Sequence, residues 1–141
     1  DLFSPQLPEG KIIALDPESS LTTWMEERKK RDSLDNVSIR KITEDNPGLD
    51  QLSDEIDLLF VGYTYFHFKD PVTYFRDKVY PYIQDKTVVA IADMAPVQGQ
   101  PRHTVSAQQV IIEMAEAGFQ LDAEPTTIYD QYLLIFKKSS R

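Results

Sequence analysis

The stretch Lys11-Ile12-Ile13-Ala14-Leu15-Asp16 decides the fold class of this chain. A short apolar run that ends in an acid is typical of a buried strand in a parallel sheet. Comparable runs recur at residues 56–62 and 87–92, and helical patterns separate them. This alternation predicts an α/β domain with a Rossmann-like, mostly parallel sheet flanked by helices.

Three helices are expected, each of them beginning at a polar capping residue. They cover residues 19–30, 70–81 and 106–118. Ser106 and Gln109 have the spacing of a capping box, which strengthens the prediction for the third helix. The charges at residues 26–31, two acids and then four bases, indicate a solvated face of the first helix.

The remaining strands are expected at residues 37–42, 119–124 and 131–136. The last two follow one another closely after the β-α units, which predicts an antiparallel hairpin at the carboxyl-terminal edge of the sheet. Residues 56–62 are almost continuously apolar and are therefore expected to form a central strand covered on both faces. We expect one domain over residues 1–141, with an irregular lead-in at residues 1–10.

Composition narrows the possible functions. The chain has 141 residues, of which 41% are hydrophobic, so it is long enough to bury a core. Its net charge of −8 disfavours binding to nucleic acid or to an anionic membrane. It contains no cysteine, which excludes disulfides and thiolate metal sites. No signal peptide or apolar run of membrane-spanning length is present, so a cytoplasmic location is expected; because the chain begins at Asp1, a processed or exported form stays open.

Asp16 is the leading candidate for a ligand-binding residue. A carboxylate at the carboxyl end of a parallel strand suits the two neighbouring hydroxyls of a ribose. The alternative is an ordinary turn or capping aspartate before Pro17. Nucleotide-binding domains of this kind carry a glycine-rich turn about 20 residues before such an acid. Here only ten residues precede Lys11, and Gly10 is the one glycine among them.

Four further stretches follow Asp16 in a recognisable order. They are residues 57–61 (Asp-Leu-Leu-Phe-Val), 65–71 (Tyr-Phe-His-Phe-Lys-Asp-Pro), 101–103 (Pro-Arg-His) and 117–119 (Ala-Gly-Phe). Their order and spacing resemble the class I S-adenosylmethionine-dependent methyltransferase domain, particularly the bacterial small-molecule type. The resemblance runs from about residue 8 to residue 137. It implies S-adenosylmethionine (SAM) as cofactor and direct transfer of its methyl group to a small-molecule acceptor, without a metal.

The chain departs from that family in several places. The family's first strand and its glycine-rich loop have no counterpart here. The Gly-Asp pair that often follows its third strand aligns with Ile42 and Thr43. Either Glu44 or Asp45 substitutes for the acid, or both are ordinary exposed carboxylates of a loop. Phe66 stands where the family usually has histidine.

The missing strand has a structural consequence. In the family fold the first strand lies between those expected here at residues 11–16 and 56–62. Its absence leaves buried backbone groups to be paired in some other way, which is costly. We therefore expect an amino-terminal segment that is not part of this chain, and weak cofactor binding by this chain alone.

The resemblance also implies roles for individual residues. The expected cofactor-binding residues are Asp16, Pro17, Glu44, Asp45, Gly62 and Tyr63. Tyr65 and Phe66 form either a wall of the acceptor site or part of the core. Arg102 and His103 either bind an acidic group of the acceptor or lie on a solvated loop.

Histidine has a pKa near neutrality, so His67 is a candidate general base; a structural histidine is the alternative. His67 and His103 lack the spacing of a metal site with Asp93, and no metal is expected. Two other functions stay open. The first is a non-catalytic interaction module that has lost its cofactor loop. The second is a Rossmann-type oxidoreductase, which the late antiparallel pair disfavours.

Overall fold

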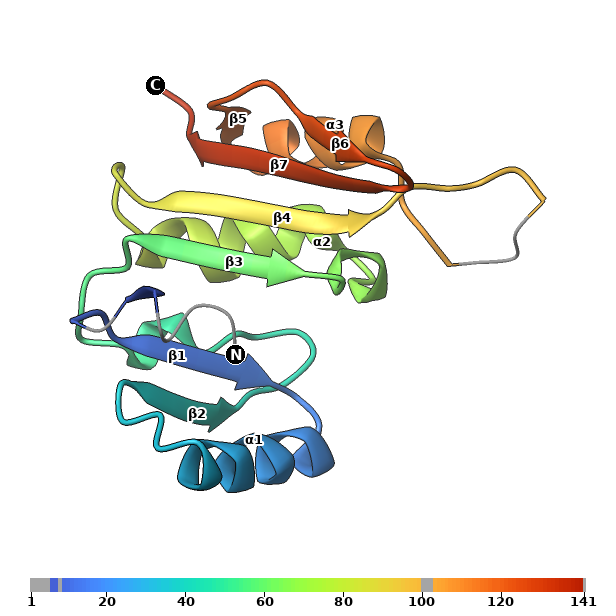
Figure 1. Ribbon diagram of the computed structural model, residues 1–141. Coiled ribbons are helices and arrows are strands. Elements are labelled where there is room, and N and C mark those ends of the chain that lie inside the picture. The colour runs from blue at the N-terminus through green and yellow to red at the C-terminus, as the bar shows by residue number, and fades with distance from the viewer. Residues whose placement is uncertain (1–5, 8, 100–102, 141) are drawn as a thin grey trace. The chain divides into compact units, whose positions relative to one another are not determined.

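The computed structural model describes residues 6–7, 9–99 and 103–140 (Figure 1). The chain divides into two compact units, residues 1–48 and residues 49–141, and each is described by itself. The expected lead-in falls only partly among the described residues, where the Gly10 N–H donates to the Leu7 carbonyl at 2.9 Å. No helix in the described ranges combines the length and the apolar character that crossing a membrane requires.

The first unit is a β-α-β arrangement. It consists of strand β1 (Ile12–Asp16), helix α1 (Ser19–Arg31) and strand β2 (Val37–Lys41). The two strands pair in parallel, with Ile12 opposite Val37 and Asp16 opposite Lys41. The sequence prediction of two parallel strands joined by a helix is confirmed, with boundaries shifted by one residue.

Helix α1 differs from its prediction at its start. The helix begins at Ser19, but the capping position belongs to Glu18, whose side chain makes no capping hydrogen bond. The Asp16 carboxylate instead accepts the Glu18 N–H at 2.8 Å. Asp16 therefore shapes the turn from β1 into α1.

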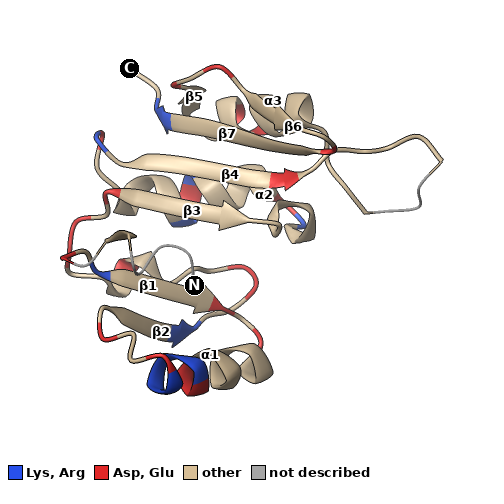
Figure 2. Cartoon of the chain, in the orientation of Figure 1, with Lys and Arg blue, Asp and Glu red and all other residues tan. Residues whose placement is uncertain are grey.

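The surface of α1 is solvated. Figure 2 shows the basic residues gathered at its carboxyl-terminal end, where Asp32 pairs with Arg28 at 3.2 Å and with Arg31 at 2.8 Å. No residue of α1, all of which are described, is buried, and Leu21 and Trp24 are largely exposed. The solvated basic face is as predicted.

The second unit contains a five-stranded sheet. Strand β3 (Leu58–Gly62) pairs in parallel with β4 (Val88–Met94), and β4 pairs antiparallel with β7 (Gln131–Lys138). Strands β5 (Phe119–Leu121) and β6 (Thr126–Ile128) both pair antiparallel with β7, giving the order β3-β4-β7-β5. This is the predicted parallel sheet with an antiparallel carboxyl-terminal edge. Strand β6 is an addition that the sequence did not indicate.

The helices of this unit supply its core. The expected helix at residues 70–81 is confirmed only in part: one α-helical turn, α2 (Pro71–Thr73), continues as a π-helix (Tyr74–Val79) and a 3₁₀ turn (Tyr80–Tyr82). Asp70 caps the start, as predicted, by accepting the Thr73 N–H at 3.0 Å. The buried side chains from this segment, from α3 (Ala107–Glu116) and from the sheet include Phe75, Met114, Phe119, Leu134 and Phe136.

Helix α3 (Ala107–Glu116) begins where the sequence predicts. The Ser106 hydroxyl accepts the Gln109 N–H at 3.1 Å, which is half of a capping box. The Gln109 side chain does not complete the box, because it donates to Glu113 at 2.9 Å. Gly118, at a φ of +98°, ends the helix in the left-handed conformation that favours glycine.

Strand β3 differs most from its prediction. It lies at the edge of its sheet, and Leu58 and Phe60 are 47% and 44% exposed. No strand in the described part of the chain pairs with its other edge, and the same holds for β1. Two strands that are apolar enough for the interior of a sheet thus each have one edge without a described strand beside it.

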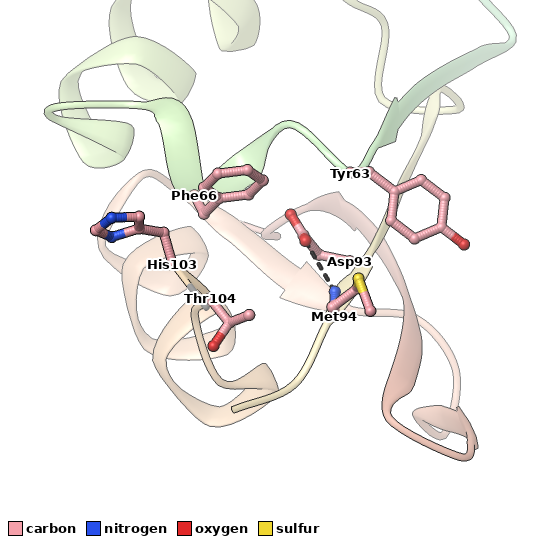
Figure 3. A pocket seen from close by; sticks show the side chains of 6 residues that line it. All are labelled: Tyr63, Phe66, Asp93, Met94, His103 and Thr104. Carbon is pink, nitrogen blue, oxygen red and sulfur yellow. Dashed lines mark hydrogen bonds between the residues drawn. The ribbon is translucent and has the colours of Figure 1, made fainter. Parts of the chain in front are cut away.

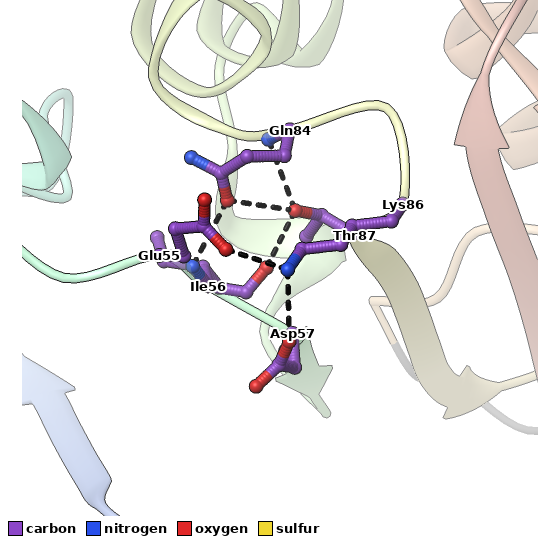
Figure 4. Close-up of polar contacts among 6 residues, drawn as sticks. All are labelled: Glu55, Ile56, Asp57, Gln84, Lys86 and Thr87. Atoms are coloured by element: carbon purple, nitrogen blue, oxygen red, sulfur yellow. Dashed lines mark hydrogen bonds and ion pairs between the residues drawn. The ribbon is translucent and has the colours of Figure 1, made fainter.

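The amino-terminal ends of β3 and β4 are joined by polar contacts (Figure 4). The Thr87 hydroxyl donates to the Ile56 carbonyl at 2.5 Å and accepts the Gln84 N–H at 3.0 Å. Lys86 pairs with Glu55 across the same two segments. The Thr87 N–H also donates to the Gln84 carbonyl at 3.0 Å, which closes the turn that leads into β4.

Candidate functional site

The candidate site of the second unit lies at the carboxyl ends of β3 and β4. Open α/β sheets bind ligands at this edge. A cavity of about 290 Å³ is found here (Figure 3), which we call the first cavity. Its lining residues are Tyr63, Phe66, Asp93, Met94, His103 and Thr104.

Tyr63 follows β3 directly and has an unusual backbone conformation. Its φ of 52° lies in the left-handed region, which a bulky residue seldom adopts. The surrounding contacts hold it there: its N–H donates to the Ala92 carbonyl at 2.7 Å and its hydroxyl donates to Gln131 at 2.7 Å. Strain of this kind is concentrated at functional sites. The sequence carries no signal for it, since glycine or asparagine is the usual residue in this conformation.

Gly62 precedes Tyr63 at the end of β3. A Cβ atom added to Gly62 would lie 2.7 Å from the ring of Phe60. The absence of a side chain at Gly62 therefore leaves room for the ring of Phe60.

Asp93 is a buried residue at the candidate site whose importance the sequence analysis did not recognise. It is 1% exposed, and its two carboxylate oxygens accept the N–H of Tyr65 at 3.1 Å and that of Met94 at 2.8 Å. Figure 3 shows the carboxylate beside the first cavity. Asp93 directly follows an apolar run in the sequence, as Asp16 does, and this shared pattern was the available signal. The carboxylate holds the start of the aromatic segment at residues 65–68 in place.

Tyr65 belongs to the core. It is 2% exposed, stacks on Phe75 with ring centroids 5.8 Å apart, and donates its hydroxyl to Glu113 at 2.7 Å. Burial and the adjacent Glu113 carboxylate raise the pKa of Tyr65 well above its usual value. Phe66, the next residue, is partly exposed and lines the first cavity.

The two histidines occupy different places. His67 ends the 3₁₀ turn Tyr65–His67, with its ring 4.0 Å from that of Phe66, and does not line the first cavity. His103 does line it. Arg102 lies outside the described residues. Within the described ranges no group of three or more histidine, cysteine, aspartate or glutamate side chains could hold a metal ion.

A second cavity, of about 260 Å³, shares part of the first cavity's lining. The shared residues are Phe66, His103 and Thr104. Its lining also contains the charged residues Lys69 and Glu113.

The expected cofactor residues of the first unit all follow its strands. Asp16 ends β1, and Glu44 and Asp45 lie in the turn after β2, where Asp45 accepts the Thr43 hydroxyl at 2.7 Å. Because β1 and β2 are parallel, their carboxyl ends lie at one edge of the sheet. One Asp16 oxygen, Oδ1, accepts the Glu18 N–H, and the structure records no hydrogen bond to Oδ2 from the described residues. Pro17 is half-buried beside it.

Comparison with known proteins gives a result at the level of structure. No protein-family model and no curated protein sequence matches the chain. A SAM-dependent methyltransferase from Aquifex aeolicus superimposes on 98% of this chain and 74% of its own, with a TM-score of 0.82 and 15% identity. The chain has the class I methyltransferase fold.

Two further structures agree with this fold. The mitomycin 7-O-methyltransferase MmcR matches 92% of this chain with a TM-score of 0.71 and 10% identity. LepI, in a complex with SAM, matches 98% with a TM-score of 0.71 and 14% identity. This chain spans 42% and 39% of those two proteins, less than half of either.

Proposed function

We propose that this chain forms part of a methyltransferase that moves the methyl group of SAM to a small-molecule acceptor. The observation that carries the proposal is the strand order β3-β4-β7-β5, with β7 reversed, in a class I fold whose ligand-binding edge holds the first cavity. Strained Tyr63 and buried Asp93 at that edge support it, because both fix the geometry of a site.

The residues of the first unit suit the adenosine end of the cofactor. The Asp16 Oδ2 atom is placed to accept hydrogen bonds from ribose hydroxyls while Oδ1 keeps the turn. Pro17 would flank the adenosine, and Glu44 or Asp45 would accept from the adenine amino group. In the second unit Gly62 and Tyr63 would contact the cofactor.

The first cavity would hold the acceptor. When bound, SAM would supply an electrophilic methyl group; the chain's own task is to orient the acceptor and exclude water. Phe66 and Tyr63 provide apolar surface for this purpose. His103 lines the cavity and His67 does not, so we assign proton acceptance from the acceptor to His103 in preference to the predicted His67.

We also propose that the open edge of β1 and the open edge of β3 are each covered by a further parallel strand. Both strands are apolar, and exposed apolar edges are a liability that proteins usually cover. In the class I fold the first strand and its glycine-rich loop supply part of the cofactor site. This chain alone is therefore expected to bind the cofactor weakly.

Calorimetric titration of S-adenosylhomocysteine (SAH) into the protein as its gene encodes it tests the proposal. We expect saturable binding that Asp16→Asn weakens about tenfold, since a charge-assisted hydrogen bond is lost while the acceptor for the Glu18 N–H is kept. Asp35→Asn, an exposed aspartate of the same unit, is the matched control and should leave binding unchanged. Absence of saturable binding would favour the alternative of a non-catalytic interaction module.

A further inference from the structure

We propose that the second cavity binds the zwitterionic end of a small molecule, with an ammonium group at Glu113 and a carboxylate at Lys69. The inference deepens the proposed function, on which it rests for the role of this molecule as acceptor. It assigns the acceptor to the class of amino acids with an apolar or aromatic body.

The negative pole of the cavity is Glu113, a half-buried residue of α3. Its carboxylate accepts the Tyr65 hydroxyl at 2.7 Å and the Gln109 amide at 2.9 Å, so both oxygens are held in place. Both donors are neutral and leave the charge uncompensated. Among the described residues no lysine, arginine or histidine forms an ion pair with Glu113. A fixed, unpaired carboxylate facing a cavity favours an ammonium ligand.

The positive pole is Lys69, which is exposed. The structure records no ion pair for Lys69 with the described residues, although Lys69 and Glu113 line the same cavity. Their charged groups are therefore more than 4.0 Å apart, the limit for an ion pair. A ligand with a single charge meets one favourable and one unfavourable pole, whereas a zwitterion satisfies both.

The remaining surface indicates what the rest of the ligand is like. Phe66 and Phe68 line the second cavity, and Phe66, His103 and Thr104 are shared with the first. The first cavity continues with Tyr63 and Met94 (Figure 3). The body of an amino acid held at Glu113 and Lys69 would thus extend along aromatic and thioether surface toward the carboxyl ends of β3 and β4.

NMR titration of the ¹⁵N-labelled protein with three probes tests this inference: L-phenylalanine, phenethylamine and 3-phenylpropionate, which share a ring and differ in charge. We expect L-phenylalanine to shift the amides of Phe68, Thr104 and Glu113 saturably and to bind about tenfold more tightly than either singly charged probe. Equal binding of all three probes, or no saturable shift at millimolar concentration, would overturn the inference.

Two variants assign the poles. Glu113→Gln, which keeps an acceptor for Tyr65, should weaken L-phenylalanine and phenethylamine about tenfold and leave 3-phenylpropionate unweakened. Lys69→Gln should weaken L-phenylalanine and 3-phenylpropionate instead. The exposed residues Glu116 and Lys78 provide the controls Glu116→Gln and Lys78→Gln, which should change nothing. The opposite pattern, or equal loss in a control, would contradict the assignment.

The titration with L-phenylalanine needs no cofactor, so its result can contradict this inference while the proposed function still holds. SAH also carries an amino-acid end, and its titration provides the comparison. Shifts at Gly62 and Tyr63 with SAH, together with shifts at Thr104 and Glu113 with L-phenylalanine, support two separate sites. Displacement of L-phenylalanine from Glu113 by SAH would overturn its role as an acceptor site. Binding of L-phenylalanine without any binding of SAH would overturn the proposed function alone.

Discussion

Replacement of Thr87 by valine tests how the two parallel strands of the second unit are held together. Thr87 is 0% exposed, and its hydroxyl serves both the Ile56 carbonyl and the Gln84 N–H (Figure 4). Valine has nearly the same shape, so Thr87→Val removes these two hydrogen bonds and leaves packing almost unchanged. A polar group left buried without a partner costs about 1 to 3 kcal/mol. Both hydrogen bonds are only partly buried, so we take the lower bound for each of the two groups that lose their partner, the Ile56 carbonyl and the Gln84 N–H. We therefore expect a loss of about 2 kcal/mol in the free energy of unfolding.

Urea unfolding followed by far-ultraviolet circular dichroism measures this loss. Thr87→Ser is the matched control: it keeps the hydroxyl and removes one methyl group, which costs about 1 kcal/mol. We therefore expect valine to be the more damaging of the two substitutions, although it is the more apolar. A Thr87→Val protein as stable as the original, or more stable than Thr87→Ser, would refute the reasoning.

Two other predictions concern stability. Gly118→Ala should destabilise the protein by about 1 to 2 kcal/mol in thermal unfolding, because the φ of Gly118 is +98° and the new Cβ would lie 3.1 Å from the Tyr80 ring. Gly99→Ala is the control. Gly99 has a φ of +81° and nothing within 4 Å of the new Cβ, so this substitution should cost less. Equal costs would show that the Tyr80 contact is unimportant. The pKa of Tyr65 is raised in the folded state, so the unfolded chain releases this proton first and stability should fall as the pH rises above about 10. Tyr65→Phe should reduce that fall, and an unchanged pH profile of the urea midpoint would contradict the shift.

The sequence predicted those parts of the fold that local pattern determines. The apolar run before Asp16, the β4 run and the stop signal at Gly118 each correspond to an observed element, because burial and backbone conformation at these places depend on neighbouring residues. The reversal of β7 also followed from two strands separated by a short connection. The class I architecture was predictable for this reason.

Features that depend on distant contacts were not predictable. The helical segment after Asp70 changes to a π-helix at Tyr74, although its capping and apolar signals are those of a regular helix. The left-handed φ of Tyr63 is held by Ala92 and by Gln131, which lie far away in the sequence. Tertiary hydrogen bonds of this kind leave no local pattern.

The sequence also predicted only part of the candidate site. The sequence directed attention to Tyr63, Phe66 and His103, which the structure brings together around one cavity. It did not reveal that Glu113, more than 40 residues after Tyr65, fixes the hydroxyl of that tyrosine at the second cavity. Pairing of a helix residue with a loop residue is set by packing and cannot be read from spacing.

The most direct test of the central claim is a residue-resolved NMR titration of SAH into the protein as its gene encodes it. The account predicts saturable shifts in the amides that follow the parallel strands, at Glu18 beside Asp16 and at Gly62 and Tyr63 after β3. Saturable shifts confined to other surfaces, or no shifts at millimolar SAH, would contradict the proposal that this chain forms part of a SAM-dependent methyltransferase.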